Sequence, residues 1–123
     1  MIDVRKWFGK EFSWRHYNCW DFLRDVWLDA TGQDLGSRKP PEVSKDGFRR
    51  AFVEQQGDVE NKLLQRITEP VTPCVALLER PGVMSHVGIF MKGKLFHLHP
   101  EKGVVLEPME VASLGFQQVK FYR

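Results

Sequence analysis

Hydrophobic residues recur at helical spacing in the first half of the chain and at strand spacing in the second half. The clearest helix is expected over 18–31, where one apolar stripe is formed by Cys19, Phe22, Leu23, Val26, Trp27 and Ala30. Asn18 suits the N-cap position, and Gly32 suits the left-handed residue that follows a last helical turn. Shorter helices are predicted over 3–10, 46–54 and 58–66.

The second half of the chain has the pattern of an antiparallel sheet. Strands are predicted over 75–78, 87–91, 94–98, 103–107 and 116–122, with a helical turn over 109–114. The loop over 32–46 is rich in Gly and Pro and interrupts the fold without dividing it. Helices followed by an antiparallel sheet predict an α+β fold. We expect a single domain over 1–123, a size that can bury its own core.

A hairpin is predicted around the Lys92-Gly93 pair, with a two-residue turn. That turn sets Gly88 opposite His97 and His86 opposite His99. Since cross-strand partners and residues two apart share a face, the three histidines should project from one side of the hairpin. Gly88 leaves room above His97. An imidazole on one strand can orient a catalytic imidazole on the next.

Two other interpretations of the three histidines are open. The first is a polar, solvated sheet surface. The second is a zinc site made by His86, His97, His99 and Cys19, a chemically sensible ligand set whose spacing matches no zinc motif.

The two cysteines have different surroundings in the sequence. Cys19 opens the predicted helix, where unpaired backbone N–H groups and the helix dipole favour a thiolate and therefore a nucleophile. A simpler explanation is that Cys19 begins the buried apolar stripe. Cys74 opens the apolar run 74–78 and is expected to be an inert, buried strand residue. The pair is not expected to form a disulfide.

Composition narrows the function class only modestly. The 123 residues are 42% hydrophobic and 12% aromatic, which is typical of a globular protein. Lys and Arg number 18 against 16 Asp and Glu, a net charge of +2, so neither nucleic acid nor a membrane surface is an expected partner. The start of the chain has no apolar stretch typical of a signal peptide. Cytoplasmic synthesis is therefore expected.

Two segments carry a more specific signal: Tyr-Asn-Cys-Trp-Asp-Phe-Leu-Arg at 17–24 and Ser-His-Val-Gly-Ile-Phe at 85–90. Together they resemble the NlpC-like family of papain-fold cysteine peptidases, in the short form carried by phages and prophages beside tail genes. The resemblance covers nearly the whole chain. It implies a papain-like fold, with N-terminal helices packed on a C-terminal antiparallel sheet. It further implies Cys19 as nucleophile, His86 as base and His97 as the orienting residue, with His99 as the alternative third residue.

The sequence departs from the family pattern near the nucleophile. Asn18 stands where many members have Asp, and Trp20 stands where many have Ser. Phe12 occupies roughly the place of a tyrosine that helps the oxyanion site in many members. Tyr17 is a candidate substitute, and Trp20 a candidate wall of the substrate groove. The backbone N–H of Cys19 is the expected oxyanion donor.

The family resemblance implies hydrolysis of peptide bonds in the stem peptides of bacterial peptidoglycan through an acyl-enzyme, without metal or cofactor. Phage tail proteins are then candidate partners. The protein would be virion-associated or would be delivered to the periplasm or cell wall. Two alternatives are open. One is a non-catalytic phage tail assembly module of the same fold, which the departures at Phe12 and Asn18 suggest. The other is a thiol transferase acting on lipid acyl groups.

Overall fold

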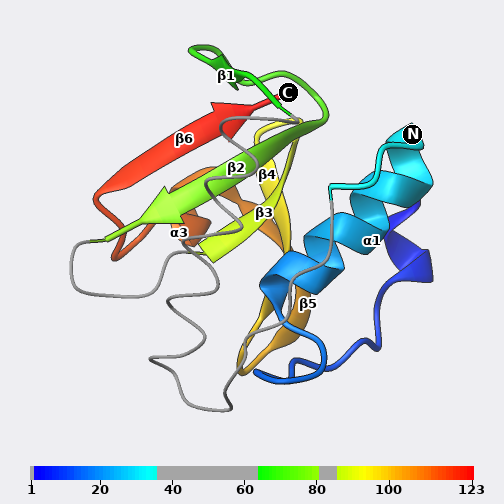
Figure 1. Cartoon of the computed structure of the whole chain (residues 1–123). Helices are drawn as coiled ribbons and strands as arrows, with labels where there is room; N and C mark the ends of the chain where they lie inside the picture. Colours follow the sequence, from blue (N-terminus) through cyan, green and yellow to red (C-terminus); the bar gives the residue numbers. More distant parts are fainter. Residues whose placement is uncertain (1, 36–63, 81–85) are drawn as a thin grey trace.

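The computed structural model describes residues 2–35, 64–80 and 86–123. Its centre is a six-stranded sheet of order β1-β6-β2-β3-β4-β5, in which every neighbouring pair is antiparallel (Figure 1). The elements, in chain order, are η1 (Val4–Lys6), α1 (Cys19–Thr31), β1 (Arg66–Ile67), β2 (Cys74–Glu79), β3 (His86–Met91), β4 (Lys94–His99), β5 (Gly103–Pro108), α3 (Met109–Ala112) and β6 (Gln118–Tyr122). The predicted α+β class is confirmed.

Helix α1 begins and ends where its caps predict. The Asn18 side chain accepts hydrogen bonds from the N–H groups of Trp20 and Asp21, and the Asp21 carboxylate accepts one from the N–H of Asn18. This reciprocal capping box fixes the first turn. At the other end Gly32 adopts φ 78°, a left-handed conformation that costs glycine little. The caps therefore place Cys19 at the first position of the helix.

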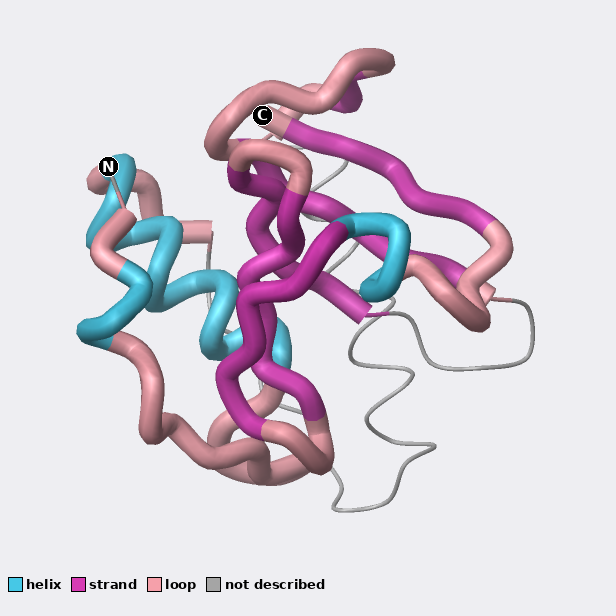
Figure 2. The backbone as a smooth tube through the Cα atoms, turned by 180° about the vertical axis from the view of Figure 1, so that it is seen from behind, coloured by secondary structure: helices cyan, strands magenta, loops and turns pink. Residues whose placement is uncertain are grey.

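The two faces of the sheet carry separate apolar clusters. The apolar stripe of α1 packs on β3 and β4 with Val87, Ile89, Phe96 and Leu98. The apolar cluster on the opposite face is smaller and contains the buried residues Ala76, Leu78, Leu95 and Ala112. Figures 1 and 2 show α1 and α3 on opposite sides of this part of the sheet. Because side chains alternate between faces along a strand, β2 and β4 contribute to both clusters.

The predicted hairpin register is confirmed where β3 and β4 pair. Ile89, Phe90 and Met91 lie opposite Phe96, Leu95 and Lys94. The turn residues Lys92 and Gly93 have φ 49° and 80°, as a two-residue hairpin requires. Towards its start, β3 stays paired with β2 as far as His86, while the described pairing with β4 stops at Ile89. This end of β3 is where the site described below is found.

Some predicted boundaries are wrong. The segment 3–10 forms only the short η1, capped by Asp3. The predicted helix over 58–66 does not reach Arg66, because Arg66 pairs with Tyr122 in β1, a strand that the sequence pattern did not predict. Strand β6 begins two residues later than expected, at Gln118. The predicted helix over 46–54 lies outside the described residues. Within the described ranges, no helix is long and apolar enough to cross a membrane.

Candidate active site

A cavity of about 340 Å³ opens between the first turn of α1, the adjoining ends of β3 and β4, and α3. Its walls include the cysteine and the three histidines singled out from the sequence, together with apolar and basic side chains. The lining residues are Phe12, Trp14, Cys19, Arg80, His86, His97, His99, Pro100, Lys102, Glu107, Val111, Ala112, Leu114 and Phe116. The fold therefore brings Cys19 and His86, which are 67 positions apart in the numbering, to one cavity.

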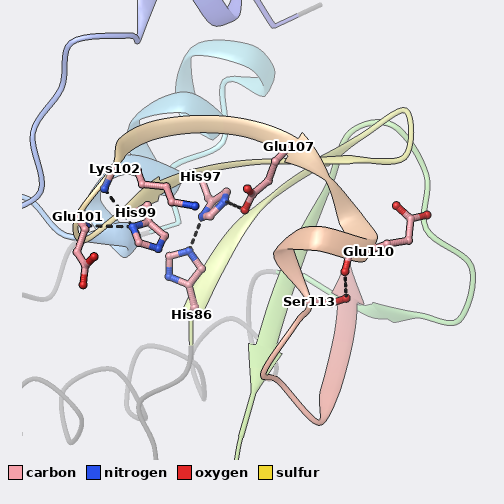
Figure 3. Close-up of polar contacts among 8 residues, drawn as sticks. All are labelled: His86, His97, His99, Glu101, Lys102, Glu107, Glu110 and Ser113. Atoms are coloured by element: carbon pink, nitrogen blue, oxygen red, sulfur yellow. Dashed lines mark hydrogen bonds and ion pairs between the residues drawn. The ribbon is translucent and has the colours of Figure 1, made fainter.

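A chain of hydrogen bonds runs from β3 through β4 to β5 along the cavity wall. Nε2 of His86 lies 2.7 Å from Nδ1 of His97, and Nε2 of His97 lies 2.9 Å from Oε1 of Glu107 (Figure 3). His97 is 3% exposed, so its ring is held with little contact with solvent. Gly88 makes the approach possible, since a Cβ at this position would lie 2.9 Å from Cβ of His97. The space that the missing side chain of Gly88 leaves is thus taken by side-chain atoms of Leu95 and His97.

The histidine that contacts His86 is His97 rather than His99. Nδ1 of His99 accepts hydrogen bonds from the backbone N–H groups of Glu101 and Lys102, in the turn after β4 (Figure 3). The extrapolated hairpin had set His99 directly opposite His86. That extrapolation is wrong because the described pairing of β3 with β4 ends before His86, and the diagonal neighbour His97 meets its ring instead.

The Cys19 thiol lies on the cavity wall yet is only 3% exposed. Burial raises its pKa to about 12, and backbone hydrogen bonding from Val87 and at the helix start opposes this rise only in part. The nearby Asp21 carboxylate raises the pKa further. The expectation of a thiolate stabilised by the helix end is therefore corrected. Desolvation outweighs the helix dipole, whose influence is of order 1 kcal/mol.

The pKa of His86 moves in the opposite direction. Burial lowers it to about 3, and the neighbouring His97 and His99 lower it further. Cys19, whose pKa is raised, and His86, whose pKa is lowered, line the same cavity and are both neutral at pH 7. A neutral thiol can attack a carbonyl group only if its proton is transferred to a base, and a neutral imidazole is able to accept one.

Two residues predicted at the substrate site are placed elsewhere. The hydroxyl of Tyr17 donates to Oδ2 of Asp25 at 2.8 Å, and Tyr17 is not among the lining residues of the cavity. Burial and this hydrogen bond raise its pKa. Trp20 is 3% exposed and packs in the core between α1 and the sheet. Phe12 does reach the cavity, in edge contact with Trp14, but its ring brings no hydroxyl.

Glu107 is the site residue that the sequence analysis missed. It lies opposite Leu95 in the β4–β5 ladder, and His97 lies opposite Val105, so Glu107 and His97 are diagonal neighbours on one face. The signal was present in the sequence as a single acidic residue in the otherwise uncharged strand 103–108. Finding it would have required the register between β4 and β5, which no turn signature supplied.

The predicted zinc alternative finds no support in the geometry. Across the described part of the chain, no group of three or more His, Cys, Asp or Glu side chains is placed to hold a metal ion. Both ring nitrogens of His97 are already hydrogen bonded. Cys74 is fully buried at the start of β2, as expected, and both cysteines are free thiols.

Comparison of the chain with family models, curated protein sequences and solved structures found no significant match.

Proposed function

We propose that this protein is a cysteine hydrolase of papain-like fold that cleaves peptide bonds in the stem peptides of bacterial peptidoglycan. Cys19 is the nucleophile, His86 the general base and His97 the residue that orients His86. The observation that carries the proposal is the His86–His97 hydrogen bond on the wall of a cavity that Cys19 also lines. A cysteine, a base and an orienting partner are the parts that covalent thiol catalysis needs.

The proposed reaction has two halves. The Cys19 sulfur attacks the carbonyl carbon of the scissile peptide while His86 takes the thiol proton. The C–N bond then breaks, and His86 returns that proton to the leaving amine, which leaves a thioester on Cys19. Water next attacks the thioester, gives a proton to His86 and releases the acid, and the proton passes back to the thiolate. The backbone N–H of Cys19, which is not part of the capping box, is the proposed oxyanion donor.

Hydrolysis of purified peptidoglycan, followed by mass spectrometry of the released fragments, tests the proposal. We expect Cys19→Ala to lower turnover by at least about 10³-fold. Cys74→Ala is the matched control, because it removes the other thiol from outside the cavity, and it should stay within a few-fold of the wild type. Undiminished turnover by the folded Cys19→Ala variant would overturn the nucleophile assignment. No release from any wall preparation by the wild type would favour the non-catalytic tail module.

One observation keeps the lipid acyltransferase as a second candidate. The side chains of Val111 and Leu114 line the cavity while remaining 49% and 74% exposed, so the entrance has an apolar rim. Such a rim suits either small apolar side chains of a peptide or an acyl chain. Release of fatty acid from phosphatidylcholine vesicles separates the two, and we expect none. Association with phage tail proteins and delivery to the cell wall stay predictions from the resemblance.

A further inference from the structure

We propose that Glu107 is a positioning residue that fixes the tautomers of both His97 and His86, so that Nδ1 is the atom of His86 left free to act as a base. The inference rests on the proposed function for its catalytic meaning. It adds a fourth residue to the site and assigns each ring proton.

The assignment starts from the carboxylate, which can only accept hydrogen bonds. Oε1 of Glu107 lies 2.9 Å from Nε2 of His97, so this nitrogen carries the proton and donates it. The side chains of His97 and Glu107 are 4% and 17% exposed, and water therefore competes little for the bond. A sheltered hydrogen bond to a carboxylate is among the stronger ones in proteins.

The next step follows from the charge of His97. Burial lowers the pKa of His97, although Glu107 works in the opposite direction, so the ring is neutral at pH 7 and holds one proton. Because that proton is on Nε2, Nδ1 has a lone pair and must accept. Its partner at 2.7 Å, Nε2 of His86, is therefore the donor.

The same reasoning, that a neutral imidazole carries one ring proton, applies to His86. A neutral His86 that donates from Nε2 keeps its lone pair on Nδ1, and this atom is the one left to receive the Cys19 proton. When His86 becomes an imidazolium, Nε2–H still donates to His97, and the Glu107 carboxylate at the far end of the chain stabilises the new positive charge. Reversing one tautomer would put an N–H on the atom that must act as base.

The tautomers can be measured without a substrate. Imidazole ¹⁵N chemical shifts in histidine-labelled protein at pH 7 should show Nε2–H tautomers for both His86 and His97. In Glu107→Gln, whose amide can donate as well as accept, both rings should shift towards mixed tautomers. Glu107→Asp, which keeps an acceptor-only carboxylate, should restore part of the wild-type pattern. The matched control is Glu110→Gln, which removes the same charge from an exposed side chain directed away from His97 (Figure 3).

Turnover provides the second readout. We expect Glu107→Gln to lower kcat by about 10- to 100-fold with little change in KM, and Glu110→Gln to stay at the wild-type rate. The pH profile should also move, because Glu107 raises the pKa of His97 and its loss lets the acid limb fall to lower pH. The other titratable and charged groups that line this cavity are His99, Lys102, Arg80 and the Cys19 thiol, of which His99 and Lys102 also lower the pKa of His97.

Each outcome decides one assignment. Nδ1–H tautomers in the wild type, or wild-type tautomers in Glu107→Gln, would overturn the inference whatever the enzyme does. The expected tautomers in a protein that hydrolyses no wall fragment would sustain the hydrogen-bond chain and reject the proposed function. Thermal unfolding of each variant checks that a changed spectrum does not come from a lost fold.

Discussion

The two cysteines are almost equally hidden, yet their surroundings differ. Cys19 is 3% exposed and Cys74 is 0% exposed, and burial raises the pKa of both thiols. Cys74 lies on a strand paired on both sides, by β3 and β6, with Phe90 as its partner in β3. Cys19 lies at a helix start close to the first residues of β3, on the wall of a cavity that three histidines also line. Burial alone thus does not distinguish the two thiols, whereas a position on the wall of a cavity lined by histidines does, and it is this position that makes Cys19 the proposed nucleophile.

Removing the proposed base, His86, should have the largest effect on the difference between Cys19 and Cys74. In His86→Gln we expect turnover to fall by about 10²- to 10⁴-fold, because a neutral thiol with a pKa of about 12 needs a partner to take its proton. Alkylation of Cys19 by iodoacetamide, mapped by mass spectrometry, should slow in parallel, while the slower labelling of Cys74 stays the same. His16→Gln, at an exposed position away from the cavity, is the control. Equal labelling of the two thiols in the wild type would remove the contrast altogether.

Stability should depend on pH on both sides of neutrality. The pKa of His86 falls from 6.5 to about 3 on folding, so the unfolded chain binds the proton first and stability is lost as the pH falls from 6.5 towards 3. The pKa of Cys19 rises from 9.0 to about 12, so stability is lost as the pH rises above 9. The contribution of each group to the slope should reach at most about 1.4 kcal/mol per pH unit, the value for one proton.

Urea unfolding at about pH 5, 7 and 10 measures these slopes. His86→Gln should flatten the acid side, and Cys19→Ala should flatten the alkaline side more than Cys74→Ala does. An acid side that is unchanged in His86→Gln would show that the imidazole is not neutral in the folded protein.

A smaller effect is expected from a substitution at Gly88, where β3 and β4 approach closely beside the cavity. A Cβ in Gly88→Ala would meet Cδ1 of Leu95 at 2.7 Å and Cβ of His97 at 2.9 Å. The Cβ of His97 is fixed by its strand, so the strands must separate. We expect a loss of about 1 to 3 kcal/mol in the free energy of unfolding, together with a weaker His86–His97 hydrogen bond. Urea unfolding and the ¹⁵N shifts of the two rings measure the effects. Unchanged values for both would mean that this close approach does not exist in solution.

The smallest effect is expected at the helix cap. Asn18→Ala removes the acceptor for two backbone N–H groups and should lower the free energy of unfolding by about 1 kcal/mol. Asn18→Ser keeps an acceptor and should recover most of this loss. If the cap also positions Cys19, the Ala variant should lose turnover beyond what its lower stability explains, whereas the environment of Cys74 should not change. Thermal unfolding and peptidoglycan hydrolysis measured on the same samples check both expectations.

Local sequence signals determined the parts of the molecule whose geometry is set by neighbours in the chain. The caps at Asn18 and Gly32 fixed the ends of α1, and Lys92-Gly93 fixed the register of the hairpin. These signals were sufficient because an N-cap or a two-residue turn is satisfied within a few residues. The position of Cys19 at the start of α1, and the common face of the histidines on their strands, could be predicted for the same reason.

Tertiary structure alone decided which of these groups meet and in what state of charge. The choice of His97 over His99, the contact with Glu107 and the placement of Tyr17 against Asp25 depend on strand ends and ladder registers that no local pattern encodes. The neutrality of Cys19 and His86 depends on burial by residues distant in sequence. Residue types and local geometry follow from neighbouring positions in the chain, whereas desolvation and long-range contacts, which set proton affinity, exist only after folding.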